Sequence, residues 1–218
     1  ANAEYVCIAE NGMVAPKPAN LSYQEAATLP YGALTALSLL RKAGVKAGYN
    51  VLINGASGGI GSYAVQIAKI MGATVTGVCG TPRMDFVRSL GADTVIDYTQ
   101  ADFTQTQSGQ RYDVIMDVIR KSTFGACKRV LAPKGIYLLV SFKMANVLQG
   151  LWTARRGGQR VMCTLSSETP ADMQTIREWA ESGALRTAID RTFPLAQAAD
   201  AHRYMESGQR TGPVVITV

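Results

Sequence analysis

Short apolar runs alternate with stretches of helical periodicity along most of this chain. The apolar runs that predict strands are 51–55, 74–79, 94–98, 112–118, 135–142 and 160–165. The stretches that predict helices are 22–27, 31–44, 60–71, 82–90, 122–131, 147–153 and 171–182. Continuous apolar strands that alternate with helices are typical of a parallel sheet covered on both faces. The pattern therefore predicts an α/β protein with a doubly wound, six-stranded parallel sheet of the Rossmann type.

The two ends of the chain depart from this alternation. Tyr5–Ala9 predicts a short strand, and the chain ends in an extended segment, an amphipathic helix and a last strand at 212–218. We expect the two end strands to be the edge of a second unit, of which only the ends are present, so that the chain begins inside a longer protein. The expected division is a dinucleotide-binding domain at 21–185, with the second unit formed by 1–20 and 186–218.

Composition narrows the classes of function. The chain has 218 residues, of which 47% are hydrophobic and 17% charged, as in globular proteins. No apolar run is long enough to cross a membrane and no signal peptide opens the sequence, so we expect a cytoplasmic protein without a membrane partner. The net charge of +6 is spread thinly, which argues against nucleic acid and suits a small anionic ligand.

Metal chemistry has little support in the sequence. There is one histidine, and the four cysteines Cys7, Cys79, Cys127 and Cys163 form no C-x-x-C pair. Zinc sites need clustered Cys and His ligands, so we expect no metal. Free and mostly buried thiols in a reducing compartment are the expected state of the cysteines.

A glycine-rich turn follows the first apolar run and supports two readings. Gly55-Ala56-Ser57-Gly58-Gly59 fits the G-x-S-x-G turn of hydrolases, in which Ser57 would be a nucleophile. The overlapping Ala56-x-Gly58-x-x-Gly61 lacks only the first glycine of a dinucleotide-binding turn. Such a turn lets backbone N–H groups and the N-terminal end of the next helix approach a phosphate. The turn follows the first strand of the alternation, where this fold binds pyrophosphate, so we favour the second reading.

The hydrolase alternative needs a triad. The order Ser, Asp, His is available as Ser57, then Asp172 or Asp190, then His202. The nucleophile turn of hydrolases comes after several earlier strands, and here no such strands precede it. His202 also lies in a helix with a polar surface pattern. Ser57 is therefore expected to donate a hydrogen bond to a phosphate or to fill the turn.

The end of the second strand bears on which nicotinamide cofactor is bound. NAD sites place Asp or Glu there, whereas this strand ends in Gly80, Thr81 and Arg83, and Asp85 lies too far into the helix. A hydroxyl and a guanidinium suit a 2′-phosphate, so the residues favour NADP(H). The short-chain dehydrogenases are excluded because they need a Tyr-x-x-x-Lys pair, which this chain lacks.

The sequence from "AEYVCIAENGMVAPKPANLSYQEAATLPYGALTALSLLRKAGV" through "VLINGASGGIGSYAVQIAK" to "GPVVITV" resembles the zinc-independent medium-chain dehydrogenase/reductases, in the quinone oxidoreductase-like branch. The resemblance covers essentially the whole chain. It implies a GroES-like substrate domain before the Rossmann domain, to which the last strands return, and most of that domain is absent here. The terminal β-segments would then be what is left of this truncated domain.

The resemblance also implies a set of cofactor-binding residues. Pyrophosphate contacts would come from Ser57, Gly58, Gly59 and Ile60. The 2′-phosphate would be held by Gly80, Thr81, Arg83 and Tyr98. The nicotinamide would lie near Thr35, Val118, Ile119, Ser141 and Phe142. No side chain is assigned as the catalytic acid. The resemblance also implies that hydride passes from NADPH to a quinone or enone without a metal or a protein nucleophile.

Three departures from the family pattern stand out. Arg120 replaces a glycine after the fourth predicted strand, Pro213 replaces a lysine before the last strand, and most of the substrate domain is missing. Two functions therefore remain open. One is an NADPH-dependent quinone or enone reductase, represented here by its cofactor-binding portion. The other is a non-catalytic NADP(H)-binding module or evolutionary remnant with no turnover of its own. The predicted edge strand Arg160–Leu165 is also a candidate contact for a homodimer.

Overall fold

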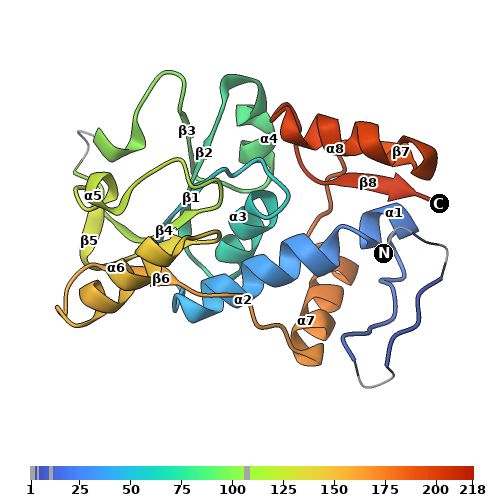
Figure 1. Cartoon of the computed structure of the whole chain (residues 1–218), viewed down its shortest axis with the longest axis horizontal. Coiled ribbons are helices and arrows are strands. Elements are labelled where there is room, and N and C mark those ends of the chain that lie inside the picture. Colours follow the sequence, from blue (N-terminus) through green and yellow to red (C-terminus); the bar gives the residue numbers. More distant parts are fainter. Residues whose placement is uncertain (1–2, 4, 10–11, 106–108) are drawn as a thin grey trace.

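A six-stranded parallel sheet forms the centre of the computed structural model, which describes residues 3, 5–9, 12–105 and 109–218 (Figure 1). Its strands are β1 (Asn50–Asn54), β2 (Thr74–Cys79), β3 (Thr94–Asp97), β4 (Tyr112–Asp117), β5 (Leu131–Leu139) and β6 (Arg160–Cys163). They lie in the order β3-β2-β1-β4-β5-β6, and each neighbouring pair is parallel. The predicted α/β sheet of the Rossmann type is confirmed.

Helices follow the strands in the predicted alternation. They are α1 (Tyr23–Ala26), α2 (Leu34–Lys42), α3 (Gly61–Ile70), α4 (Met84–Ser89), α5 (Phe124–Cys127), α6 (Met144–Ala154), α7 (Pro170–Glu181) and α8 (Ala198–Glu206). Short 3₁₀ or π-helical turns lie at Leu29–Ala33, Thr81–Arg83, Phe103–Gln105 and Leu195–Gln197. The helix predicted at 122–131 is shorter in the structure, where α5 has only four residues. β5 begins at Leu131, which the prediction places inside the helix.

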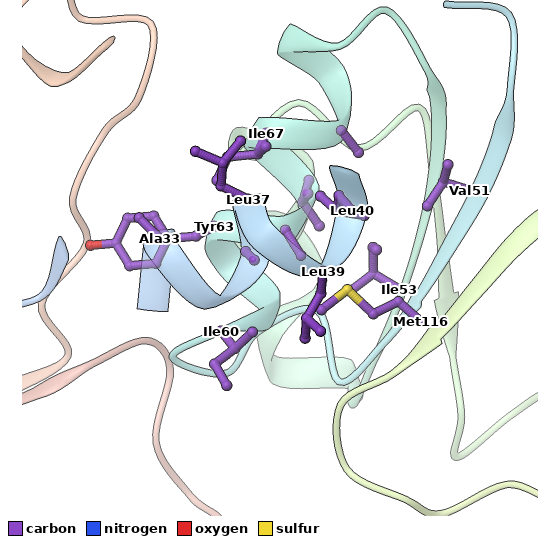
Figure 2. Close-up of a cluster of buried hydrophobic side chains, with 14 of the residues drawn as sticks. Ala33, Leu37, Leu39, Leu40, Val51, Ile53, Ile60, Tyr63, Ile67 and Met116 are labelled. Atoms are coloured by element: carbon purple, nitrogen blue, oxygen red, sulfur yellow. The ribbon is translucent and has the colours of Figure 1, made fainter. Parts of the chain in front are cut away.

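One face of the sheet is covered by α2, α3 and α4, and α7 packs against α2. Figure 2 shows Ile53 and Met116 of this face beside Leu39 and Leu40 of α2. All of these side chains are completely buried. Their continuous burial explains why β1 is an apolar run rather than an alternating one.

The opposite face of the sheet has its own core. Leu52 and Ile115 point to this side and pack with Phe124 and Cys127 of α5 and with Tyr137 of β5. Because successive residues of a strand point to opposite faces, the same short apolar runs supply both cores. The sheet is therefore packed between two apolar layers. This packing fixes the positions of the strand ends, where a ligand site can form.

The strand order places β1 at the point where the connections change direction. β2 and β3 follow on one side of β1, and β4, β5 and β6 on the other. In open α/β sheets of this kind, ligands bind at the carboxyl ends of the strands on either side of such a switch point. The turn after β1 lies at this position.

The C-terminal part of the chain forms a small second layer beside α3 and α4 (Figure 1). Its strands β7 (Arg191–Pro194) and β8 (Val214–Thr217) pair in parallel, which confirms the predicted last strand. Gln66 of α3 joins this part to the sheet domain through two hydrogen bonds with the backbone of Arg186, of 2.9 and 3.0 Å. The division at 185/186 stays a prediction.

The predicted strand Tyr5–Ala9 is wrong. These residues are described, but they form no strand. Tyr5 is 90% exposed and Ile8 is 59% exposed. A strand needs the hydrogen bonds of a neighbour, and no described segment pairs with this one, so its apolar residues lie along an irregular stretch.

Candidate functional site: the carboxyl edge of the sheet

The turn between β1 and α3 is built on close backbone contacts. Gly55 has a φ of +90°, which favours glycine, and its carbonyl accepts a hydrogen bond of 3.1 Å from the N–H of Gly58. A Cβ placed on Gly61 would collide with the carbonyl oxygen of Gly55. Gly61 is therefore required for α3 to begin this close to the end of β1.

The same turn presents unpaired amide groups. No described residue accepts a hydrogen bond from the backbone N–H of Ser57, Gly59 or Ile60. These donors lie just before the first residue of α3, where the helix dipole adds positive potential. Donors of this kind need an acceptor, and a phosphate would supply several oxygens at once.

The hydrolase triad does not form. Asp172 caps α7 and forms an ion pair with Arg41, while Asp190 accepts a hydrogen bond of 2.7 Å from the hydroxyl of Tyr204. His202 is exposed on α8, and no described hydrogen bond joins it to either aspartate. Ser57 is buried in the turn and has no base beside it.

The residues predicted for the 2′-phosphate gather at the end of β2. The ring of Tyr98 lies against Gly80, because a Cβ placed on Gly80 would be 3.4 Å from the Tyr98 hydroxyl. Thr81 is exposed at the start of the following 3₁₀ turn. Arg83 ends this turn and donates a hydrogen bond of 2.6 Å to the carbonyl of Gly208 in the C-terminal part.

Sequence reasoning missed a carboxylate in this group. Asp97, at the end of β3, accepts hydrogen bonds from the hydroxyl of Thr81 and from the N–H and hydroxyl of Thr99. The hydrogen bond from Thr81 is the largest cause that lowers the pKa of Asp97 below its usual value. Asp97 lies in a neighbouring strand, 16 residues from Thr81, and its only signal in the sequence is its position at the end of that strand.

The predicted nicotinamide end is formed by the loops after β4 and β5. The N–H of Val118 donates a hydrogen bond of 3.1 Å to the carbonyl of Asn54, so this loop lies directly beside the glycine turn. Cγ2 of Ile119 fills the space above Gly55, 2.7 Å from a Cβ placed there. Arg120 has a φ of +52°, a conformation in which a glycine would be unstrained.

A buried carboxylate holds the loop after β4 in place. Asp117 is completely buried and accepts hydrogen bonds from Asn54 Nδ2 (3.1 Å), the Tyr137 hydroxyl (2.7 Å) and the Ser122 N–H (3.1 Å). Burial, and then the hydrogen bond to Asp117, raise the pKa of Tyr137. Tyr137 therefore stays protonated and acts as a fixed donor.

The remaining predicted residues are less closely tied to the turn. Ser141 is exposed and Phe142 half-buried in the loop after β5. Thr35 is half-buried in the first turn of α2. The preceding π-helical turn packs on the glycine turn, because a Cβ placed on Gly32 would collide with the carbonyl oxygen of Gly59.

The described residues offer neither a metal-binding group nor a membrane-spanning helix. No group of three or more His, Cys, Asp or Glu side chains gathers in the described ranges. No helix in the described part of the chain is long and apolar enough to span a bilayer. A hollow of about 540 Å³ lined by Tyr49, Asp113 and Lys134 lies at the amino ends of the strands, away from the glycine turn.

Known proteins resemble this chain in sequence. A family model described as zinc-binding dehydrogenase matches residues 90–216, more than half of the chain. The 2-methylene-furan-3-one reductase of Solanum lycopersicum is 34% identical, over 98% of this chain and 52% of the reductase. The mitochondrial NAD(P)H oxidoreductase RTN4IP1 of Mus musculus is 31% identical, over 99% of this chain and 61% of that protein.

A solved structure agrees with these matches. The quinone oxidoreductase of Coxiella burnetii superposes with a TM-score of 0.84 at 30% identity, over 93% of this chain and 63% of that one. The chain thus spans between about half and two thirds of the length of these three relatives. The glycine turn, the strand order and the matches together show that the chain belongs to the zinc-binding dehydrogenase family, among its medium-chain, quinone oxidoreductase-like members.

Proposed function

We propose that this chain is the cofactor-binding portion of an NADPH-dependent oxidoreductase that reduces quinones or enones. The observation that carries the proposal is the turn after β1, which leaves the N–H groups of Ser57, Gly59 and Ile60 without acceptors at the start of α3. A dinucleotide pyrophosphate would satisfy these donors. The names of the relatives, two reductases of oxygen-containing substrates and an NAD(P)H oxidoreductase, support the same chemistry.

The choice of NADP(H) rests on charge at the end of β2. Arg83 lies beside Gly80 and Thr81, and its guanidinium would pair with a 2′-phosphate. Asp97 opposes this preference through its negative charge, but both of its oxygens are engaged by Thr81 and Thr99. The 2′-phosphate would therefore meet a guanidinium that forms no ion pair with a described carboxylate, and a carboxylate that is already hydrogen-bonded.

Catalysis in such a site depends mainly on positioning. When bound, the nicotinamide supplies the hydride. The chain's own residues would hold the ring in place: Ile119 over the glycine turn, and Asp117 with Tyr137 keeping the loop after β4 rigid. None of the residues assigned to the site is placed to donate a proton to the oxygen of a quinone or enone, so this proton would come from another group.

One observation favours the second candidate, an NADP(H)-binding module without turnover. Ile119 is 46% exposed at the nicotinamide end, and Tyr5 and Val218 are also largely exposed. An uncovered nicotinamide would meet water as readily as substrate. Binding and turnover therefore have to be measured separately.

A titration with NADPH and NADH, followed by nicotinamide fluorescence, tests the proposal. We expect micromolar binding of NADPH, and Arg83→Ala to weaken NADPH binding about tenfold while NADH binding changes little, because only the 2′-phosphate loses its cation. Arg88→Ala is the matched control, since Arg88 lies on α4 but pairs with Asp85. A quinone turnover assay then separates enzyme from module. Absence of binding by either cofactor would contradict the reductase and the binding module, and would favour a remnant that has lost its cofactor site.

A further inference from the structure

The segment between α8 and β8, residues 207–213, crosses both turns of the proposed cofactor site. At one end of this segment, the carbonyl of Gly208 accepts the hydrogen bond from Arg83. At the other end, the N–H of Gly212 donates a hydrogen bond of 2.8 Å to the carbonyl of Ser57. Gly212 has a φ of +104°, and a Cβ there would collide with the carbonyl oxygen of Ala188, so a glycine is needed for this crossing. The segment is therefore attached to the glycine turn and to the turn after β2.

Arg210 lies in the middle of this segment. Its side chain reaches the glycine turn, because Nη1 would be 3.5 Å from a Cβ placed on Gly59. The residue is half-buried. No acidic side chain in the described part of the chain lies within 4.0 Å of its guanidinium, in contrast to Arg88 and Arg203, which pair with Asp85 and Asp200.

The surroundings of Arg210 are positively polarised. The N–H of Gly59 points to no acceptor among the described residues, and the start of α3 adds the positive end of the helix dipole. The nearest carboxylates in the site are engaged elsewhere, Asp97 by two threonines and Asp190 by Tyr204. A half-buried guanidinium held against such a turn has its favourable partner in an anion that both can contact.

We propose that Arg210 is a further cofactor-binding residue, which contacts the pyrophosphate at the glycine turn beside Gly59. The inference rests on the proposed function. It assigns the two arginines different roles: Arg83 recognises the 2′-phosphate, and Arg210 the pyrophosphate that NADPH and NADH share. Bound cofactor would then join the C-terminal part of the chain to the sheet domain.

Fragments of the cofactor separate these roles. ADP-ribose carries the pyrophosphate without a 2′-phosphate, and 2′-AMP carries a 2′-phosphate without the pyrophosphate. We expect Arg210→Gln to weaken ADP-ribose, NADH and NADPH alike, each about tenfold, the factor that one charge-assisted hydrogen bond contributes. Binding of 2′-AMP should change less than twofold in Arg210→Gln. Arg83→Ala should instead weaken 2′-AMP and NADPH and leave ADP-ribose and NADH nearly unchanged.

Two further variants keep the result interpretable. Arg203→Gln removes an arginine of the same C-terminal part that pairs with Asp200 on the surface, and it should bind every probe as the unaltered chain does. Arg210→Lys keeps the charge but not the planar fork, and it should restore part of the affinity. Calorimetric melting of each variant shows whether it remains folded.

Distinct outcomes contradict the two proposals. ADP-ribose binding that is unchanged in Arg210→Gln, while the unaltered chain binds it, would overturn the role of Arg210 alone. Tighter ADP-ribose binding in Arg210→Gln would also overturn it, because the arginine would then be blocking the turn. No binding of ADP-ribose or NADPH by the unaltered chain would overturn the proposed function and this inference together.

Discussion

Single glycines decide whether the turn after β1 can form. The general dinucleotide-binding motif has glycine at position 56, where this chain has a completely buried alanine. The methyl group of Ala56 fits because the strand beside it has Gly77, and a Cβ placed on Gly77 would lie 3.1 Å from it. A side chain at Gly61 could not be accommodated in this way, because the backbone carbonyl of Gly55 lies directly against it. The missing first glycine is therefore compensated by packing, while Gly61 has no substitute.

Gly61→Ala should destabilise the chain. The added Cβ meets the carbonyl oxygen of Gly55, so α3 must move away from β1, at a cost of about 3 kcal/mol in the free energy of unfolding. Urea denaturation measures this loss. The control is Gly125→Ala in α5, where the nearest atom is 4.0 Å away. A Gly61→Ala variant as stable as this control would contradict the close approach of α3 to β1.

At the scale of elements, local signals placed most helix and strand ends to within a few residues, and the largest differences are at α5 and β5. Gly44 and Gly183, which follow α2 and α7, have positive φ values of 71° and 77°, as the sequence predicts for residues that end helices. β5, in contrast, begins at Leu131, before the turn-like residues 132–135, and its pairing with β4 shifts register between Tyr112 and Val114. Such a bulge depends on the neighbouring strand, so its position is not visible in the segment itself.

The start of α7 offers a test of an element. The hydroxyl of Thr169 accepts from the N–H of Asp172, and the carboxylate of Asp172 accepts from the N–H of Thr169, which forms a capping box. Thr169→Ala should lower the free energy of unfolding by about 1 kcal/mol, measured by urea denaturation. Thr175→Ala is the control, because Thr175 is half-buried within the same helix and its hydroxyl donates only to the carbonyl of Ala171 in the described residues. An equal decrease in the free energy of unfolding in both variants would show that the capping box does not stabilise α7.

At the scale of the whole molecule, the C-terminal part depends on the sheet domain. A two-stranded sheet such as β7–β8 is marginal by itself. Here it is supported by α8, by the contact of Gln66 with Arg186, and by the contact of Gly212 with Ser57. Two of the three supports join it to the sheet domain, and one of these lies at the proposed cofactor site.

The homodimer through Arg160–Leu165 stays a proposal, and the structure narrows the surface available for it. The N–H of Val161 on the edge strand already donates a hydrogen bond of 3.0 Å to the hydroxyl of Thr153 in α6, and the carbonyl of Leu165 accepts from Lys42. The outward face of α6 beside this edge is apolar. Its exposed side chains are Met144, Leu148, Leu151 and Trp152.

Light scattering after size exclusion tests the dimer. We expect a dimer at micromolar concentration, and Leu148→Glu should shift it to monomer, because a charge would be buried between two copies of α6. Tyr5→Glu removes an apolar side chain that is even more exposed and lies far from this surface, and it should leave the dimer intact. A monomer at every concentration would refute the proposal. A dimer unaffected by Leu148→Glu would exclude the outward face of α6 from the interface.

The sequence alone determined the order of strands and helices, the parallel sheet and the glycine turn, because apolar periodicity and the freedom of glycine are local properties of the chain. Tertiary structure decided what surrounds the turn: Asp97 beside Thr81, Ile119 above Gly55, and Arg210 against Gly59. These contacts join segments that are distant in sequence. Only the packing of the sheet and the return of the C-terminal part bring them to one edge, so no local pattern could reveal them.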